Sequence, residues 1–449
     1  MANRFYPYIS ALFLLLLCSC APQLNTIAPA DLQQISQDPR DVIRSVESDQ
    51  PLLGPDEQRQ FWDNFRDTYF LPWHSTAPLP TTAHPFWAID WISRNTVYDK
   101  TLRPLQQQQR DALIQRAGQQ SFPTEHRRAI TVVSCSARAL PTASPLFYNP
   151  QQAGQGFPFD QLQHAMLPAN TPVQVSHRSA DGAWLFVETA AIYGWVANSA
   201  VAWVDSEQIA RIESAPLAAV IRDQVAILGP VDQWYGDGRI GMLLPLASPE
   251  PSSHRVLIAV AGPDQRAQFT EATLAEDALL RAPLPLSPQN IARLAAPMMG
   301  QSYDWGEQFG GRDCSATLRD LFAPFGVWLP RNSSQQAEVG HVIPLADLSP
   351  EQREQRILEQ GIPFATLVRL PGHIMLYVGQ HDGHAIVLHT LWGLKTTSLF
   401  GKEGRWLVGK TVLTTLQPGL EQDGLWQSIG DLRSRITQMS LPLQPAQSE

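Results

Sequence analysis

The sequence predicts an α+β chain of several domains, in which helices come first, short strands follow, and helices then strands return near the C-terminus. Phe61, Phe65 and Tyr69 recur at helical spacing, and from about Arg128 apolar residues alternate with the period of two typical of strands. Further on, an amphipathic helix that opens at Cys314 precedes two alternating runs that each carry a histidine. The 449 residues suggest about three domains and are ample to bury hydrophobic cores without disulfide bonds.

Composition narrows the class of protein. Charged residues make up 17% of the chain and proline 37 of its 449 residues, which favours a loop-rich globular protein with short strands. The net charge is −9, and no block of like charge stands out. Because phosphate binding requires a basic face, we expect no nucleic-acid partner.

The first twenty residues indicate export. Arg4 precedes the apolar run Ile9–Leu17, which is too short to span a bilayer and is typical of a signal-peptide core. The sequence that follows, Leu-Cys-Ser-Cys, resembles the lipobox of bacterial lipoproteins, so we expect a signal peptide at 1–19 and lipid on Cys20. Ala21 after it is similar to the outer-membrane signal of Gram-negative lipoproteins. We therefore expect a protein anchored on the periplasmic side of a bacterial membrane, with ordinary cleavage without lipid as the alternative.

Only two cysteines, Cys135 and Cys314, remain for the folded body. So few thiols in an exported chain argue against a disulfide-built fold, although a single bond between these two stays open. Cys135 falls in an alternating run and is predicted to be a half-buried strand residue.

Residues 20–127 are predicted to form a mostly helical N-terminal clamp. One helix starts near Pro55 and is expected to end at Pro72, and a second covers about residues 104–117. This region offers no chemistry of its own, and His74 within it is interpreted as incidental.

Residues 128–205 and 206–280 are each predicted to form a small β-barrel. In the first, the strand Pro172–His177 leads into the hairpin turn Asp181-Gly182 and then to further short strands. This order of residues resembles the bacterial SH3-like domains of cell-wall enzymes. The loop between Phe147 and Leu162 is longer than a barrel turn needs, and long ordered loops are often functional.

The candidate chemistry lies in residues 281–415. Ser287 predicts the start of one helix, and Asp313 predicts the N-cap of a second helix that begins at Cys314. A helix N-terminus stabilises a thiolate and can lower a cysteine pKa from about 8.5 towards about 4–7. A nucleophilic cysteine also needs a base and a group that orients the base. His373, at the start of one predicted strand, and His389, on the next, are the candidates.

The register of these two strands decides whether the histidines meet. A two-residue turn at Asp382-Gly383 would pair His389 with Leu376, on the face away from His373. We therefore predict a loop with an odd number of residues or a bulge. If His389 instead points away, His384 becomes the alternative third residue.

A helix-opening cysteine followed by two strands that each bring a histidine is the circularly rearranged papain arrangement. The segment at about 285–415 resembles the NlpC family of papain-like cell-wall hydrolases in four motifs, and the domains before it extend the resemblance over nearly the whole mature chain. The motifs are Tyr-x-Trp-Gly at 303–306, Asp-Cys-Ser at 313–315, Leu-Pro-Arg-x-Ser-x-Gln at 329–335 and Gly-His-x-x-x-Tyr-x-Gly at 372–379.

The resemblance implies roles for individual residues. Cys314 would be the nucleophile, His373 the general base and acid, and His389 the group that orients His373. Tyr303, Asp313 and Ser315 would line the substrate groove. The implied reaction is hydrolysis of the γ-D-glutamyl–diaminopimelic acid bond of peptidoglycan stem peptides through a thioester, with no cofactor or metal. Peptidoglycan or its stem peptides would be the partner of a monomeric enzyme.

The sequence departs from the family pattern in two places and leaves three competing functions open. The family's usual Gly-Asp-Leu-x-Phe strand is absent before His373, and the gap from His373 to His389 is long. His381, His384 and His389 could bind zinc with Cys314, but no cysteine pair or His-Glu-x-x-His pattern supports this. The chain could also be a non-catalytic wall-binding lipoprotein, or a papain-like amidase that cleaves a different bond.

Substrate selection is expected to depend on the long loop of the first barrel. In enzymes of this family, loops of that module can restrict the groove to free stem peptides or leave it open to the intact wall. Asp160 in the loop is our candidate to pair with a free α-amine, and a turn cap is the equally weighted alternative. Residues 416–449 are predicted to be a C-terminal helix and a tail, disordered after about Thr437.

Overall fold

The structure, a computed structural model, describes residues 28–43, 50–79, 84–248, 250, 254–424 and 427–445. The predicted signal peptide and Cys20 lie outside these ranges. Within them, no helix is both long and apolar enough to cross a membrane. The predicted α+β class is confirmed, since the described residues contain both helices and strands, which follow one another in separate runs.

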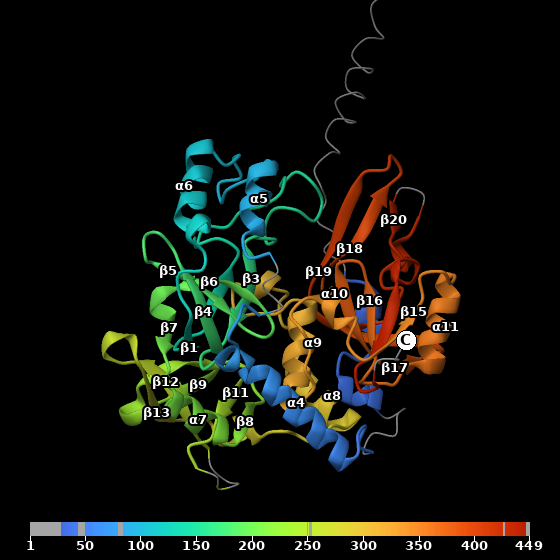
Figure 1. The fold of residues 1–449 in the computed structure, drawn as a ribbon. Helices are drawn as coiled ribbons and strands as arrows, with labels where there is room; N and C mark the ends of the chain where they lie inside the picture. Colours follow the sequence, from blue (N-terminus) through green and yellow to red (C-terminus); the bar gives the residue numbers. More distant parts are fainter. Residues whose placement is uncertain are drawn as a thin grey trace, which may run out of the picture.

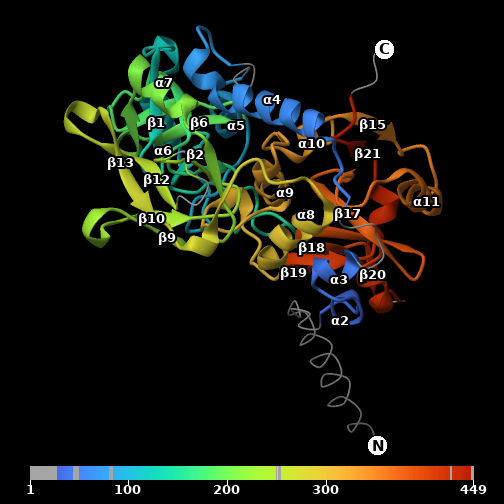
Figure 2. The same ribbon diagram turned by 90° about the horizontal axis from the view of Figure 1, so that it is seen from below.

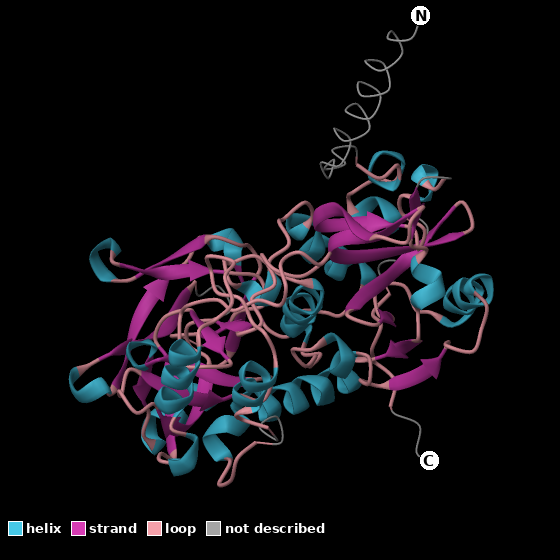
Figure 3. Cartoon of the chain, turned by 90° about the horizontal axis from the view of Figure 1, so that it is seen from above, coloured by secondary structure: helices cyan, strands magenta, loops and turns pink. Residues whose placement is uncertain are grey.

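The described residues form two lobes (Figure 1). One lobe contains helices α5 and α6 and the strands β1–β14, and the other contains helices α8–α11 and the strands β15–β21. Strands gather within each lobe, and loops fill much of the region between them (Figure 3). A catalytic groove between the lobes would therefore draw on residues far apart in the sequence.

Helix α4 connects the two lobes (Figure 2). Its Phe65, Phe70 and Trp73 are buried in one core with Ile130 of the first lobe and Ala323 of the second. This is the contact expected of a clamp. The N-terminal helices are α2 Asp31–Gln34, α3 Pro39–Val42, α4 Pro55–His74, α5 Trp87–Arg94 and α6 Gln107–Ala117.

The predicted stop at Pro72 is wrong, because α4 continues to His74 with the proline inside it. A proline near the end of a helix removes one backbone donor without breaking the remaining half-turn. Helix α5 was not predicted from the sequence.

The first β module forms one antiparallel sheet in the order β3-β2-β6-β5-β4-β1-β7. The face of the sheet that lines the module's own core carries Ala129, Val175, Val187 and Val196, all buried. The strands are β1 Arg127–Thr131, β2 Cys135–Arg138, β3 Gln163–Leu167, β4 Pro172–Arg178, β5 Trp184–Glu188, β6 Tyr193–Ala197 and β7 Val201–Trp203.

The second β module has two small sheets, ordered β10-β9-β13-β12 and β11-β8-β14. The Gly- and Asp-containing stretch Trp234–Gly238 forms strand β10, which pairs with β9, and the chain reverses just before it, at Pro230–Asp232. Its elements are α7 Ser206–Ser214, β8 Leu217–Val220, β9 Val225–Leu228, β10 Trp234–Gly238, β11 Leu243–Pro245, β12 Arg255–Ala261, β13 Ala267–Thr273 and β14 Leu279–Arg281.

In the second lobe, the sheet runs in the order β15-β21-β16-β17-β18-β19, with β20 paired to β18. Helices α8 and α9 pack on one face of it. Its elements are α8 Pro288–Ala295, α9 Cys314–Phe322, α10 Ser333–Gln336, α11 Pro350–Gln360, β15 His341–Pro344, β16 Leu367–Leu370, β17 His373–His381, β18 His384–Ser398, β19 Glu403–Thr414, β20 Gln427–Ile429 and β21 Gln438–Leu441.

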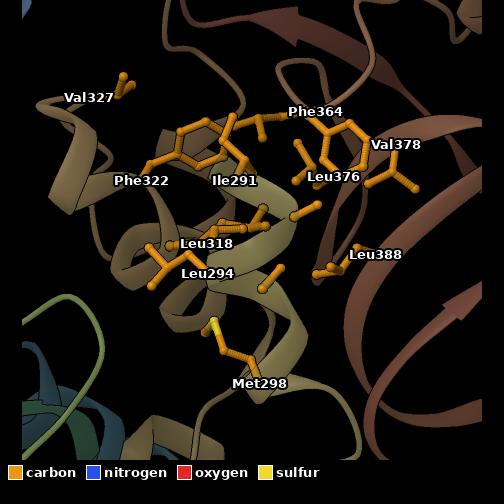
Figure 4. Close-up of a cluster of buried hydrophobic side chains, with 14 of the residues drawn as sticks. Ile291, Leu294, Met298, Leu318, Phe322, Val327, Phe364, Leu376, Val378 and Leu388 are labelled. Carbon is orange, nitrogen blue, oxygen red and sulfur yellow. The ribbon is translucent and has the colours of Figure 1, made fainter. Parts of the chain in front are cut away.

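The core of this lobe confirms that the helix predicted at Cys314 is amphipathic, with its apolar side chains buried (Figure 4). Helix α9 packs against β17 and β18, α8 packs against α9, and their apolar side chains meet in one buried cluster with those of the two strands. The participants are Ile291 and Leu294 from α8, Met298 from the 3-10 turn Ala296–Met298 that follows it, Leu318 and Phe322 from α9, and Leu376, Val378 and Leu388 from the sheet.

The prediction of a C-terminal helix and a disordered tail is wrong for the described residues. Strand β21 lies inside the sheet, between β15 and β16, and pairs Met439 with both Ile343 and Val368. Met439 is fully buried. A short apolar run in a Pro/Gln/Ser-rich segment thus forms a strand, because backbone pairing with a strand on each side stabilises it.

Candidate active site

Cys314 is the first residue of α9, as predicted, and Asp313 is its N-cap. Oδ1 of Asp313 accepts from the amide of Ala316 at 2.9 Å, and Oδ2 accepts from the amide of Gly306 at 3.1 Å. The Thr317 hydroxyl donates to the Asp313 carbonyl at 2.9 Å. These bonds fix the direction in which the chain enters the helix and hence the position of the thiol.

The thiol itself is not activated by its position alone. Burial, followed by the negative charge of Asp313, raises the pKa of Cys314 to about 12. The amides of Ile374 and Ser315 and the Arg331 guanidinium act in the opposite direction but are outweighed. The expectation that the helix N-terminus lowers this pKa is therefore wrong for the described environment, and a thiolate requires a base.

The two histidines meet. Nε2 of His373 lies 2.9 Å from Nδ1 of His389, and the ring centroids are 5.1 Å apart. Both rings are buried. Burial, with the charge of Arg435, lowers the pKa of His373 to about 4, and burial with His373 lowers the pKa of His389 well below its ordinary value. Both imidazoles are therefore neutral at pH 7.

A bulge brings this pair together, as predicted. The hairpin has a two-residue turn, with His381 paired to His384. Between Tyr377 and Gly379 the register then shifts by one residue, so that further along Leu376 pairs with Leu388. The next step of this register places His389 on the same face of the sheet as His373.

The thiol and the base are neighbours that are not yet bonded. Cys314 adjoins the amide of Ile374, the residue after His373. Among the described residues, none forms a hydrogen bond with Nδ1 of His373, and its Nε2 is engaged by His389. Nδ1 is thus the ring nitrogen available to receive the thiol proton. Bonds of this kind are often long before substrate binds.

Arg331 holds the substrate-lining residues in place. Its Nη1 donates to Asp313 Oδ1 at 3.0 Å and to Ser315 Oγ at 2.9 Å, and its Nη2 donates to Asp313 Oδ2 at 2.6 Å. Burial acts to raise the pKa of Asp313, but the Arg331 charge and its hydrogen bonds hold it below the ordinary value. Asp313 is therefore an ionised, fully engaged carboxylate. Arg331 stands in one of the four sequence motifs but was not singled out as a site residue.

A groove of about 460 Å³ contains the thiol. Of the residues implied to line it, Tyr303, Asp313 and Ser315 all do so, together with Cys314. One side belongs to the second lobe, and the opposite side belongs to the first. The additional lining residues are Trp87, Gln161, Gln163, His164, Ala191, Ile192, Tyr193, Trp305, Gly306, Arg331, Asn332, Ser333, Ser334, Gln335 and Gly372.

Gln161, in the long loop expected to contact the groove, lines it, but sequence reasoning missed the other lining residues of the first lobe. Trp87 of α5 stacks on the His164 ring, with centroids 5.7 Å apart and planes 13° apart. Nδ1 of His164 lies 3.0 Å from the carbonyl oxygen of Tyr193, so this nitrogen is the donor. The three residues come from a helix and two strands, and no short-range pattern places them beside Cys314.

Of the two roles considered for Asp160, the structure supports the turn cap and not the partner of a substrate amine. Its side chain is fully buried, and its Oδ2 accepts from Nη1 of Arg138 at 2.6 Å. Its Oδ1 accepts from the amides of Leu146 and Leu162, each at 3.0 Å. The carboxylate therefore organises the long loop from within, as a turn cap would. Only its backbone reaches the site, where the carbonyl accepts from Nε1 of Trp305 at 2.9 Å.

Behind the groove, Glu307 joins three arginines. Its fully buried carboxylate lies 3.0 Å from Arg331, 2.7 Å from Arg319 and 3.1 Å from Arg239. Glu307 also has a φ of 63°, a strained value for a residue with a side chain. Such a backbone persists only where its surroundings hold it, and here the ion pairs do so.

Asp320 continues this ion-pair network into the second β module. It lies 2.6 Å from Arg319 and 2.8 Å from both Arg239 and Arg312. Arg312 in turn forms a two-pronged bond with Asp223, at 2.8 and 2.9 Å. Burial acts to raise the pKa of Asp320, but its arginine partners hold it well below the ordinary value. Arg239 and Asp223 belong to the second module, so the network ties that module to helix α9.

The histidines considered for a zinc site are separated. His384 lies at the hairpin turn, with its Nδ1 3.3 Å from Oε1 of Glu354, while His389 faces His373. In the part of the chain that the structure describes, no group of three or more His, Cys, Asp or Glu side chains could hold a metal ion. Cys135 and Cys314 are both free thiols.

Comparison with known families matches four stretches of the chain. Residues 300–400 match the NlpC/P60 family, and residues 9–122 match the N-terminal stabilising domain of NlpC/P60 proteins. Residues 145–197 match an SH3 domain of the SH3b1 type, and residues 205–249 match one of the SH3b2 type. The β modules and the helical clamp are thus of the kinds that the sequence predicted.

A solved structure of this family has the same fold over nearly the whole chain. An NlpC/P60 endopeptidase from Photobacterium damselae subsp. piscicida is 26% identical, with 92% of this chain and 98% of that chain covered and a TM-score of 0.83. An NlpC/P60 family protein from Bacillus cereus is 15% identical over 70% of this chain and 99% of that chain, with a TM-score of 0.45. No curated protein matches the chain.

Proposed function

Because this chain belongs to the NlpC/P60 family, we propose that it is a cysteine endopeptidase of peptidoglycan stem peptides that hydrolyses the γ-D-glutamyl–diaminopimelic acid bond. The observation that carries the proposal is the site itself. Cys314 opens α9 inside a polar groove, and the hydrogen-bonded pair His373–His389 lies on the strands that α9 packs against.

The first half of the reaction forms a thioester. Nδ1 of His373 takes the thiol proton as Sγ of Cys314 attacks the γ-carbonyl carbon of the D-glutamyl residue. The carbonyl π electrons move to oxygen, and the backbone N–H of Cys314 donates to that oxyanion. One such donor in acyl transfer is worth about 3 kcal/mol. The C–N bond then breaks, and His373 gives its proton to the leaving amine of diaminopimelic acid.

The second half returns the enzyme to its starting state. A water molecule attacks the thioester carbon while Nδ1 of His373 takes one of its protons. The C–S bond breaks, the thiolate recovers a proton from His373, and the γ-carboxyl group of the D-glutamyl residue is released. Throughout, His389 accepts from Nε2–H of His373 and keeps the ring oriented.

The electrostatics of the pair favour general-base catalysis over a preformed ion pair. With a Cys314 pKa of about 12 and a His373 pKa of about 4, both groups are neutral at pH 7. Substrate closes the groove over the thiol and brings Sγ and Nδ1 within bonding distance, as catalytic hydrogen bonds commonly tighten in the Michaelis complex.

The decisive experiment is digestion of two substrates, read by mass spectrometry. Wild type, Cys314→Ala and the matched control Cys135→Ala are each incubated with intact sacculi and with free L-Ala-γ-D-Glu-diaminopimelate. We expect wild type and Cys135→Ala to cut the γ-D-glutamyl bond and Cys314→Ala to leave it intact. Cleavage of another amide bond would indicate an amidase of different specificity, and binding without cleavage a wall-binding lipoprotein. Undiminished cutting by Cys314→Ala would refute the mechanism.

The same experiment separates two biological uses of the enzyme. Activity on the free peptide alone indicates recycling of stem peptides, whereas activity on sacculi indicates lysis of the wall. The first lobe supplies one side of the groove, which supports restriction to short, free peptides.

We also propose that the enzyme is a monomer anchored by lipid on Cys20 to the outer membrane, facing the periplasm. The support is the sequence around Cys20 alone. Metabolic labelling with a radioactive fatty acid should mark wild type and leave Cys20→Ala unlabelled. Equal labelling of both proteins would exclude Cys20 as the acceptor.

A further inference from the structure

Thr414, the last residue of β19, completes a hydrogen-bonded chain that begins at the catalytic base. Its side chain is almost fully buried. Oγ1 of Thr414 lies 3.1 Å from Nε2 of His389 and 2.6 Å from the carbonyl oxygen of Thr415. Nothing in the sequence motifs singled this threonine out.

The direction of each bond in this chain follows from one fact, that a carbonyl oxygen can only accept. The Thr414 hydroxyl must therefore donate its single hydrogen to the Thr415 carbonyl. Its oxygen can then only accept from Nε2 of His389, so that nitrogen carries the proton. Because His389 is neutral, its Nδ1 has no proton and is an acceptor.

The consequence reaches the base. Nδ1 of His389 accepts from His373, so Nε2 of His373 carries the proton. In a neutral imidazole the other nitrogen then has a free lone pair, and in His373 this is Nδ1. That is the nitrogen that has no partner among the described residues and that must receive the thiol proton.

We propose that Thr414 is a positioning residue, which fixes the tautomers of His389 and His373 and so keeps Nδ1 of His373 ready as the base. The proposal rests on the proposed cysteine-peptidase function, in that it takes Cys314 as the thiol served by this base. Without the Thr414 hydroxyl, His389 has no acceptor for Nε2–H and is free to place its proton on Nδ1. That proton would face Nε2–H of His373 and drive His373 to the Nδ1–H tautomer, which cannot act as a base.

A test needs a readout that a merely structural role would not change. Thr414→Val keeps the shape and removes the hydroxyl, whereas Thr414→Ser keeps the hydroxyl. We would measure alkylation of Cys314 by iodoacetamide from pH 5 to 9, without substrate, by peptide mass spectrometry. The groups that face the thiol and the base, Asp313, Arg331, Tyr303, Arg435 and the amide of Ile374, are unchanged in both variants.

We expect Thr414→Val to alkylate at Cys314 on the order of ten- to a thousandfold more slowly at pH 7, because a wrong tautomer at a catalytic histidine has costs of this size or larger. Thr414→Ser should stay near the wild-type rate. Cys135, in β2 of the first lobe, is an internal control whose rate should be the same in all three proteins. An unchanged Cys314 rate in a folded Thr414→Val would overturn the proposal.

Two further measurements keep the proposal independent of the variant's folding and of the bond that is cleaved. Nitrogen-15 chemical shifts of histidine-labelled wild type report the tautomers directly, and the proposal requires Nε2–H in both His373 and His389. Nδ1–H in either ring would overturn it. If wild type fails to cleave the stem peptide while the shifts and the alkylation rates are as expected, the proposed substrate is wrong and the role of Thr414 stands.

Discussion

The 2.9 Å contact between Nε2 of His373 and Nδ1 of His389 depends on a single extra residue in β17. The two-residue turn at Asp382-Gly383 would alone set the wrong register, and the bulge before Gly379 corrects it. Bulges of this kind re-aim side chains next to active sites. The result is a pair of neutral, buried imidazoles rather than a solvent-exposed base.

Burial of this pair predicts an unusual pH dependence. With a His373 pKa of about 4, the base stays unprotonated as pH falls well below 6.5. We expect kcat/KM for the stem peptide to be level from about pH 8 to pH 5 and to decline only near pH 4, where Nδ1 becomes protonated. A pH–rate profile in a constant-ionic-strength buffer measures this. An acid limb at pH 6.5–7 would instead indicate a solvated base or a preformed thiolate–imidazolium pair.

The same burial requires a control for stability. His373 and His164 each have a pKa of about 4 when folded, against an ordinary value of 6.5. The unfolded chain binds protons to these histidines more readily between the two values. Their contribution to the free energy of unfolding is therefore complete above pH 6.5 and is lost as pH falls towards 4. Thermal melts at each pH must therefore accompany the rates, and only pH values at which the protein is folded enter the profile.

The ion-pair network predicts that Glu307→Gln is strongly destabilising. The substitution removes one buried negative charge from among Arg239, Arg319 and Arg331, and a buried pair that loses one partner typically costs about 3–5 kcal/mol. The strained φ of residue 307 would also lose its restraint. Denaturant unfolding of wild type and variant measures the difference.

A matched control tests whether the loss of stability in Glu307→Gln comes from the burial of the ion pairs or simply from the loss of one charge. Glu271 pairs with Arg255 at 2.9 Å on the surface of the second β module, where both side chains are more than half exposed. Exposed pairs contribute about 0–1 kcal/mol, so Glu271→Gln should have little effect. Similar losses for both variants would mean that the network near Cys314 has no special energetic role.

The buried position of Asp160 predicts that its substitution lowers stability and leaves substrate choice unchanged. Asp160→Ala would leave Arg138 buried without its carboxylate and would free the amides of Leu146 and Leu162. We expect a loss of about 3–5 kcal/mol in unfolding free energy. At a temperature where the variant is folded, its ratio of activities on peptides with free and acetylated N-termini should equal that of wild type. A change in that ratio alone would restore Asp160 as a substrate-binding residue.

What could be predicted from the sequence was local. The Asp313 cap and the Cys314 helix follow from residues next to one another, and the need for a bulge before His389 follows from counting along one hairpin. The pKa of Cys314 could not be predicted, because burial depends on everything packed around the thiol. The partner of Asp160 was equally hidden, since Asp160 lies in the long loop and Arg138 lies 22 residues away in strand β2.

The residues on the far side of the groove could not be predicted from the sequence either. Trp87 comes from the N-terminal region, in which no site chemistry was expected, yet it lines the groove with Cys314. Its position depends on how the stabilising domain docks on the first β module, through its stack on His164. No periodicity within residues 20–127 carries that information.

This position makes Trp87→Ala a test of how substrate is held. Trp87 lines the groove but belongs to the first lobe, whereas the reacting groups belong to the second. Removing the indole should weaken substrate and transition state alike. We expect KM for the free stem peptide to rise roughly 5- to 30-fold, equivalent to about 1–2 kcal/mol, while kcat stays nearly constant. Steady-state kinetics on the free peptide separate the two constants.

The matched control is Trp234→Ala, because Trp234 lies on strand β10 of the second β module and is 63% exposed. Its kinetics should equal those of wild type. If Trp87→Ala lowered kcat and left KM unchanged, the indole would be supporting the reacting groups and not the bound peptide. If Trp87→Ala also gained activity on intact sacculi, the indole would be a barrier that excludes the polymer, and restriction to free peptides would reside in the contact between α5 and the first β module.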